Sequence, residues 1–257
     1  MTSLKRFRMF AGPNGSGKST LYERLRKDSI IRTDIYLSAD RIEAEFRKTR
    51  RFVFNAYRVK VTESEFKSDA ALSGVLRKHP NIHKLLSRVQ VKSGVLTISD
   101  KASIDSYLAS FIASYLAKKL FESGQSFCFE TVMSHPSKID LIKEAVGYGF
   151  KTYLYFVFTD DPNINIQRID LRKKAGGHGV AKDKIRSRFK RSLNALPDAV
   201  KVADKSYLVD NSETIGKTYD VVAEIEKGKK IKAVKAGYDF KKKLPAFYKT
   251  YKKQLEK

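Results

Sequence analysis

The sequence predicts an α/β protein in which a parallel β-sheet is flanked by helices. Short apolar runs alternate with segments of helical periodicity, which is the pattern of βαβ units. The run Thr152–Phe158 is almost continuously apolar, as a strand buried on both faces of a parallel sheet should be. A glycine-rich segment, residues 12–17, separates the first apolar run from an amphipathic helix start.

Five apolar runs are predicted to be strands. The first precedes the glycine-rich segment, the second precedes Asp40 and the third precedes Glu130. In chain order the five strands are Arg6–Ala11, Ile35–Ser38, Ser126–Phe129, Thr152–Phe158 and Ser206–Val209. A connected series of this kind predicts one large α/β domain.

Two helices have recognisable ends. Apolar residues from Ile104 to Leu120 recur with a period of 3.6 residues, and Gly124 provides a stop just beyond the last turn. Asp161 and Pro162 form an N-cap followed by proline at the first helical position, which predicts a helix through about Lys174. These helices fit the connections that a parallel sheet requires.

The stretch from about residue 47 to 101 interrupts the alternation. It is longer than the roughly 2–6 residue connections that are usual in α/β units, so we expect an inserted, mainly helical segment. A helix around Asp69 to Val89 is predicted within it, and the segment is expected to cover the substrate site. The predicted organisation is therefore a domain of residues 1–220 with this insertion, followed by a basic extension of residues 221–257.

Composition limits the class of protein. The 257 residues are 42% hydrophobic, and no apolar run approaches the roughly 20 residues of a membrane span, so we expect a cytoplasmic protein with no membrane partner. The single cysteine, Cys128, lies in an apolar run and is expected to be a buried thiol in a reducing compartment.

The chain is strongly basic. Its 52 Lys and Arg against 28 Asp and Glu give a net charge of +24, which favours anionic ligands and nonspecific contact with nucleic acid. Much of the excess lies between Lys227 and Lys257, interleaved with aromatic residues. A solvated helical face or a frayed terminus is the preferred interpretation, and a nucleic-acid-binding surface is the alternative.

The glycine-rich segment matches G-x-x-x-x-G-K-[ST], the Walker A motif or P-loop. Its glycines let backbone N–H groups turn toward a polyphosphate, and the following helix adds its positive end. Lys18 is expected to reach the β- and γ-phosphates of ATP, and the Ser19 hydroxyl to ligate Mg²⁺. The predicted nucleotide-binding residues are Gly12, Pro13, Asn14, Gly15, Ser16, Gly17, Lys18, Ser19 and Thr20.

Two acidic residues follow predicted strands. Asp40 is placed to accept the proton of an attacking hydroxyl, or alternatively to cap a helix starting at Arg41 or Ile42. Glu130 is expected to hold the acceptor or a metal-bound water, although a structural role is also open, and Thr131 is either a substrate contact or a helix cap. Without an apolar run ending in Asp at Walker B spacing or a guanine-binding Asn-Lys-x-Asp motif, a small kinase is the simplest interpretation.

Several arginines are candidates to neutralise transferring phosphate. Arg168 and Arg172 are four residues apart and share a helix face, and Arg188 is predicted to point inward from the next helix. The intervening residues 175–180 are glycine-rich, which suits a lid, and they include His178 as a further candidate. A solvated basic face is the alternative for these residues.

Together these residues resemble the zeta-toxin family of P-loop kinases. The likeness rests on residues 11–20, Asp40, Phe129–Thr131, Arg168 with Gly176–His178, and Arg188–Leu193, and it spans roughly residues 5 to 212 without the insertion. It implies a nucleotide-kinase-like sheet and phosphorylation of a UDP-N-acetyl sugar, typically at the 3′-hydroxyl of UDP-N-acetylglucosamine.

By the same resemblance, Lys18 binds phosphate, Asp40 is the base, Glu130 contacts the acceptor and Arg168 stabilises the transferring group. Arg172 and Arg188 compete for the place of a second arginine, and an antitoxin is a possible partner. Two other functions stay open from the sequence: a polynucleotide or RNA kinase, favoured by the basic tail, and an ATP-binding switch with little turnover.

Overall fold

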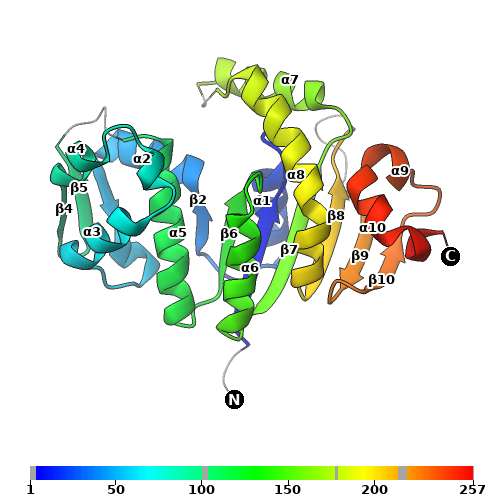
Figure 1. Cartoon of the computed structure of the whole chain (residues 1–257), viewed down its shortest axis with the longest axis horizontal. Coiled ribbons are helices and arrows are strands. Elements are labelled where there is room, and N and C mark those ends of the chain that lie inside the picture. Colours follow the sequence, from blue (N-terminus) through cyan, green and yellow to red (C-terminus); the bar gives the residue numbers. More distant parts are fainter. Residues whose placement is uncertain (1–3, 100–103, 177–178, 214–218, 257) are drawn as a thin grey trace. The chain divides into compact units, whose positions relative to one another are not determined.

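The computed structural model describes residues 4–99, 104–176, 179–213 and 219–256, which are arranged as two compact units (Figure 1). Unit 1 consists of residues 1–33 and 130–257, and unit 2 of residues 34–129. Strand β6 (Phe127–Thr131) crosses the boundary, so its last two residues, Glu130 and Thr131, belong to unit 1. Within the described residues, no helix combines the length and the apolar character needed to cross a bilayer.

In the sheet of unit 1, three parallel strands have their carboxyl ends on the same side of the sheet. Its order is β10-β9-β8-β7-β1, with β1 parallel to β7, β7 parallel to β8, and the other two pairs antiparallel. The strands are β1 (Arg6–Ala11), β7 (Lys151–Phe158), β8 (Lys205–Asp210), β9 (Asp220–Glu226) and β10 (Lys230–Val234). The register pairs Ala11 with Phe156 and Phe158 with Asp210, so the loops after β1, β7 and β8 leave from the same edge. Ligands of open α/β sheets bind at this edge.

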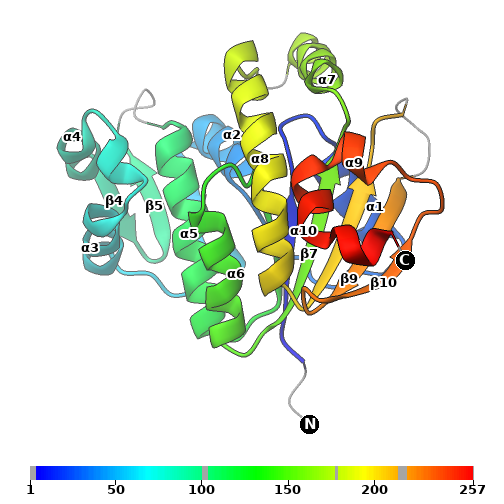
Figure 2. The same cartoon turned by 45° about the vertical axis from the view of Figure 1, so that its right-hand side comes forward.

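Helices cover both faces of this sheet. The helices of unit 1 are α1 (Lys18–Lys27), α6 (Ser137–Gly147), α7 (Pro162–Lys174), α8 (Lys182–Val202), α9 (Phe240–Lys243) and α10 (Pro245–Leu255). Figures 1 and 2 show α6, α8 and α10 over one face and α1 over the other. The predicted cap of α7 is confirmed, because the Asp161 side chain accepts a hydrogen bond from the Asn163 N–H. Ile166 and Ile169 of α7 pack with Ile185 of α8.

The basic tail differs from the solvated face or frayed end that its lysines suggested. Residues 220–234 extend the sheet as β9 and β10, and α10 packs on α8. The aromatic residues interleaved with the lysines supply the apolar face of this tail: Phe240, Phe247 and Tyr251 are at most 4% exposed. Their burial anchors the segment, while Lys241, Lys242 and Lys249 between them are exposed.

Unit 2 contains a small antiparallel sheet and a helical layer. Its elements are β2 (Tyr36–Ser38), α2 (Ala39–Thr49), β3 (Arg51–Val53), η1 (Phe54–Tyr57), α3 (Glu63–Leu72), η2 (Leu76–Lys78), α4 (Ile82–Ser87), β4 (Val89–Lys92), β5 (Val95–Ile98) and α5 (Ser106–Glu122). The three-stranded sheet has the order β3-β5-β4, and β2 pairs with β6. Helix α5 confirms the prediction from Ile104 to Leu120.

The predicted helix around Asp69 to Val89 is wrong. Helix α3 ends at Leu72, a short 3₁₀ turn follows, and α4 begins only at Ile82. Gly74 and Pro80 explain the break, because glycine is a poor helix former and proline removes a backbone donor. Ser93 and Gly94, both at positive φ, then form the tight turn of the β4–β5 hairpin.

Candidate active site

The phosphate loop, residues 12–17, joins β1 to α1, and its backbone requires glycine at three positions. Gly12, Gly15 and Gly17 have φ values of 135°, 76° and 99°. A Cβ at Gly12 would lie 1.9 Å from the Val157 carbonyl oxygen, and one at Gly15 would lie 2.8 Å from the Asn165 carbonyl oxygen. The glycines of the motif therefore let the loop pass directly against β7 and α7.

Four carbonyl groups of the loop are held by side-chain donors. The bonds run from Lys18 Nζ to Pro13 O (2.8 Å), Asn165 Nδ2 to Asn14 O (2.6 Å), Asn211 Nδ2 to Ser16 O (2.7 Å), and Tyr219 OH to Gly17 O (3.1 Å). A trans peptide points its carbonyl and the next N–H in opposite directions. Holding these carbonyls therefore turns the N–H groups of the following residues away from the four donors, as an anion-binding loop requires.

Two buried polar groups of the loop suit a polyphosphate. Ser16 is 0% exposed, and its hydroxyl has no hydrogen-bond partner among the described residues. The Lys18 side chain belongs to a residue that is only 6% exposed and carries a positive charge into the loop. A buried hydroxyl without a partner is costly unless a ligand satisfies it, so the Ser16 hydroxyl fits a loop that binds the phosphates of a nucleotide.

A candidate metal position lies at the start of α1. The Ser19 hydroxyl donates a hydrogen bond to Glu130 Oε2 at 2.6 Å, which joins the second residue of α1 to the end of β6. A hydroxyl and a carboxylate are oxygen ligands of the kind that Mg²⁺ takes, with phosphate oxygens and water completing the octahedron. Among the described residues no group of three or more His, Cys, Asp or Glu side chains is arranged to hold a metal.

The structure gives Glu130 a more specific place than the sequence did. The apolar run Phe127–Phe129 is followed by Glu130, whereas the Walker B pattern expected from the sequence has aspartate at this place. A glutamate at that position reaches the P-loop serine. An apolar run followed by glutamate is therefore the sequence feature that indicates the second acid of the candidate site.

Helix α7 rests on the phosphate loop through a fully buried asparagine. Asn165 and Thr159 are both 0% exposed, and their side chains are hydrogen-bonded to each other. Asn165 also donates to Asn14 O, so one side chain ties the loop to the first turns of α7. Arg168 lies one helical turn further on the same face.

Arg168 is the predicted arginine whose surroundings are most unusual. Its Nη2 donates to the Glu213 carbonyl oxygen at 2.9 Å, and its Nη1 is buried without a partner among the described residues. Burial lowers the pKa of this guanidinium, and the nearby Tyr219 opposes that shift. Arg172 is exposed and Arg188 is half-buried, so their roles as phosphate ligands stay predictions.

For Asp40 and Thr131 the structure describes the surrounding backbone but does not test the predicted role in the site. Helix α2 begins at Ala39 with Ser38 as its N-cap, so Asp40 lies exposed in the first turn and does not cap a helix starting at Arg41 or Ile42. Asp40 belongs to unit 2, and its role as base stays a prediction. The Thr131 hydroxyl accepts from Met133 N at 3.1 Å, which closes a turn well before α6, so it is not a helix cap. Gly177 and His178 lie outside the described residues.

Three residues that hold the loop were not predicted: Asn165, Asn211 and Tyr219. Asn165 offers a weak sequence signal, since it is a polar residue on the buried side of α7 beside Ile166 and Ile169. Asn211 follows the last predicted strand, at the edge where ligands bind. Nothing in the sequence singles out Tyr219.

No protein-family model matches the chain. Among curated proteins, a thymidylate kinase of Geobacillus sp. (strain WCH70) is 24% identical over 221 residues, which cover 83% of this chain and 92% of that protein. A chain of the crystal structure of AvrRxo1-ORF1:-ORF2 with ATP is 14% identical at a TM-score of 0.56, covering 98% of this chain and 64% of that chain. A structure of the PezAT chromosomal toxin–antitoxin system of Streptococcus pneumoniae is 13% identical at a TM-score of 0.48, covering 100% of this chain and 89% of that chain.

These comparisons agree with the fold that the sequence predicts. The chain has a P-loop kinase fold, with a mainly parallel sheet flanked by helices and the phosphate loop after β1. It spans a little under two thirds of the length of the AvrRxo1-ORF1:-ORF2 chains that it resembles.

Proposed function

We propose that this protein is a kinase that transfers the γ-phosphoryl group of ATP to a hydroxyl group of a small acceptor. The observation that carries the proposal is the phosphate loop, whose carbonyls accept hydrogen bonds from Lys18, Asn165, Asn211 and Tyr219, with the Ser19–Glu130 pair at the start of the following helix. This arrangement serves a polyphosphate that carries a metal ion.

In this proposal each residue acts on one part of the transfer. The loop N–H groups and Lys18 would hold the β- and γ-phosphates, and Ser19 and Glu130 would hold Mg²⁺, which would supply positive charge beside the phosphate oxygens. Arg168 approaches from α7 and stabilises the charge that develops on the transferred group. Asp40 takes the proton of the attacking hydroxyl, as a carboxylate can when the hydroxyl lies within hydrogen-bond distance.

The proposed acceptor is a nucleotide sugar of the UDP-N-acetylglucosamine type. The support is the zeta-toxin-like set of motifs around Lys18, Asp40, Glu130 and Arg168. The relative named thymidylate kinase supports a second candidate, a nucleoside monophosphate, because its similarity covers 83% of this chain. A protein partner that controls the kinase is also proposed, since the similar AvrRxo1-ORF1:-ORF2 structure is a complex.

The test is incubation with ATP, Mg²⁺ and separate acceptors, followed by mass analysis for an added phosphate. The acceptors are UDP-N-acetylglucosamine, thymidylate and an oligonucleotide. A phosphorylated small acceptor that Asp40→Asn abolishes would support both the activity and the base. Asp34→Asn is the matched control, because Asp34 is an exposed acid of unit 2 whose side chain, among the described residues, pairs with Arg58. Transfer to the oligonucleotide alone would favour a polynucleotide kinase, and binding of ATP without transfer would favour a switch.

A further inference from the structure

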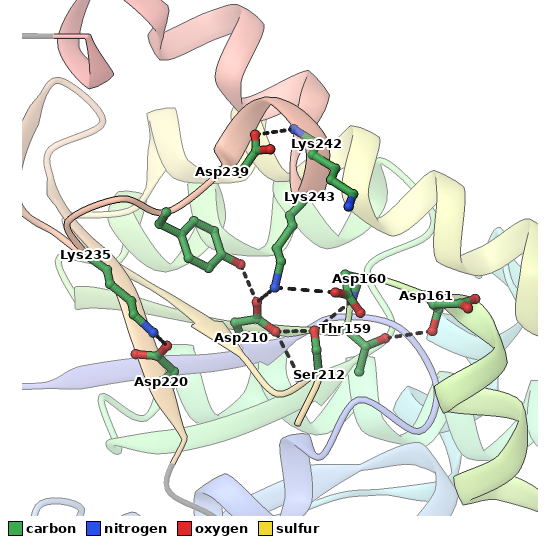
Figure 3. A network of polar contacts seen from close by, with 11 residues as sticks. Thr159, Asp160, Asp161, Asp210, Ser212, Asp220, Lys235, Asp239, Lys242 and Lys243 are labelled. Atoms are coloured by element: carbon green, nitrogen blue, oxygen red, sulfur yellow. Dashed lines mark hydrogen bonds and ion pairs between the residues drawn. The ribbon is translucent and has the colours of Figure 1, made fainter. Parts of the chain in front are cut away.

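A polar network at the carboxyl ends of β7 and β8 is centred on Asp210 (Figure 3). The Asp210 side chain is only 7% exposed. Its Oδ1 accepts hydrogen bonds from the Ser212 N–H at 2.9 Å and from the Ser212 hydroxyl. Its Oδ2 accepts from the Tyr238 hydroxyl and from Lys243 Nζ at 2.9 Å. A buried carboxylate is thus satisfied by donors from two separate parts of the chain.

The same network fastens the loop after β7. Lys243 Nζ lies 3.4 Å from Asp160 Oδ2, so the ammonium group bridges the two carboxylates. The Asp160 N–H donates to the Ser212 hydroxyl at 2.9 Å. The loops that follow β7 and β8 are therefore joined to each other and to Lys243, as Figure 3 shows.

The residue inside this network, Asn211, is one of the four whose side chains hold the phosphate loop. Asn211 lies between Asp210 and Ser212, and its N–H extends the sheet by donating to Phe158 O at 2.8 Å. Its side chain donates to Ser16 O at 2.7 Å, and a Cβ at Gly17 would lie 2.4 Å from its Nδ2. The direction of this side chain follows from the position of its two neighbours, which the network fixes.

The donors Tyr238 and Lys243 are held in turn by the C-terminal segment. The Asp239 side chain caps α9 by accepting from Lys242 N at 2.9 Å. Phe240 packs on Phe247 with ring centroids 5.9 Å apart, and both residues are at most 4% exposed. Burial alone would raise the pKa of Asp210, but the bonds from Ser212, Tyr238 and Lys243 outweigh it and lower the pKa. Asp210 is thus charged at neutral pH and needs both distant donors.

We propose that Tyr238 and Lys243 are positioning residues for ATP binding, which hold Asp210 and Ser212 so that Asn211 keeps the phosphate loop in its nucleotide-binding form. The C-terminal segment then contributes to the ATP site without touching ATP. This inference rests on the proposed function, because it assumes that the loop binds ATP.

The experiment compares Lys243→Met and Tyr238→Phe with the wild type by titration calorimetry with ATP and Mg²⁺. Each variant removes one donor to Asp210 and keeps the apolar bulk of the side chain. We expect ATP affinity to fall on the order of tenfold, equivalent to about 1.4 kcal/mol, for Lys243→Met, and less for Tyr238→Phe. Lys243→Arg keeps the charge and should recover most of the affinity.

Lys235→Met is the matched control. Lys235 follows directly after β10 and pairs with Asp220 at the start of β9; its side chain is about half exposed and takes no part in the bonds to Asp210 (Figure 3). The Lys235→Met variant should bind ATP with the affinity of the wild type. In an Asn211→Ala background, Lys243→Met should cause little further loss, because the lysine acts through Asn211.

The outcomes separate the two proposals. A wild type that binds ATP together with a folded Lys243→Met variant of unchanged affinity would overturn the positioning role and leave the proposed function standing. Equal losses in Lys243→Met and Lys235→Met would also overturn it, since a general charge effect would explain both. A wild type that binds no ATP would overturn the proposed function and this inference together.

Discussion

Asn165→Leu removes the side chain that joins α7 to the phosphate loop and keeps a similar volume. Asn165 is fully buried, bonds to Thr159, and donates to Asn14 O at 2.6 Å. Leucine can satisfy neither partner. We expect the phosphate loop and α7 to lose their fixed relation, so that both ATP affinity and stability fall.

The magnitude follows from the two groups that lose a hydrogen bond to Asn165, the Asn14 carbonyl and the Thr159 hydroxyl. An unsatisfied buried polar group costs about 1–3 kcal/mol, and the Thr159 hydroxyl keeps a contact with Asp161 O at 3.3 Å, so its share lies at the low end. The loss in the free energy of unfolding should therefore be about 2–4 kcal/mol. If about half of it is expressed in the loop, the Kd for ATP rises on the order of tenfold.

Urea denaturation measures the stability loss, and calorimetry with ATP and Mg²⁺ measures the affinity. Asn163→Ala is the control, because Asn163 lies exposed on the same helix and its side chain contacts only Asp161 and Arg186 among the described residues. That variant should change stability by about 0.5 kcal/mol or less. A folded Asn165→Leu protein whose Kd for ATP stays within twofold of the wild type would refute the reasoning.

Three further predictions follow from the same unit. Gly12→Ala should abolish ATP binding and lower the free energy of unfolding by about 3 kcal/mol or more, because the new Cβ would lie 1.9 Å from Val157 O. Thermal unfolding measures the stability and calorimetry measures the ATP affinity. An unchanged ATP affinity would contradict this prediction. Glu130→Gln should raise the Mg²⁺ concentration needed for ATP binding on the order of tenfold, because it removes the carboxylate that accepts a hydrogen bond from the Ser19 hydroxyl. A titration with Mg²⁺ at a fixed ATP concentration measures this change. An unchanged midpoint would show that Glu130 is not a metal ligand. Burial raises the pKa of Tyr251 to about 12, so its neutral phenol stabilises the fold fully below pH 10 and this contribution is lost as pH rises toward 12. Tyr251→Phe should flatten the fall in unfolding free energy over that interval, and an unchanged slope would show that this phenol is not responsible.

The strands that build the site were predictable because each is a strong local pattern. Thr152–Phe158 differs from the observed β7, Lys151–Phe158, by one residue. Strand β9 was not predicted, because Asp220–Glu226 alternates apolar and acidic residues only in its second half and is followed by a lysine-rich stretch. The aromatic residues of the tail, Phe240, Phe247 and Tyr251, belong to the buried core and form its apolar side.

The residues that hold the phosphate loop were not predictable for a different reason. The bonds of Asn165, Asn211 and Tyr219 to the loop join residues 151, 195 and 202 positions apart in the chain. A sequence motif describes a local stretch of backbone. The donors, in contrast, are brought to the phosphate loop by the way that the sheet arranges β1, β7 and β8 side by side. Sequence reasoning could locate the strand ends where such donors collect, but it could not say which polar side chain points at which carbonyl.

Arg168 is half-buried, and its buried Nη1 atom supports the proposal that an anion binds beside it. A guanidinium loses hydration when it is buried, and the lowered pKa of Arg168 reflects that loss. Its Nη2 has the Glu213 carbonyl, but a neutral carbonyl offsets only part of the charge, and Nη1 has no partner among the described residues. A phosphate oxygen would supply a charge-assisted bond there. Exposed Arg172 loses little hydration and gains correspondingly little from such a bond. The stabilisation of a transferring phosphoryl group should therefore depend on Arg168, and on the Asn165 contact that sets the position of α7.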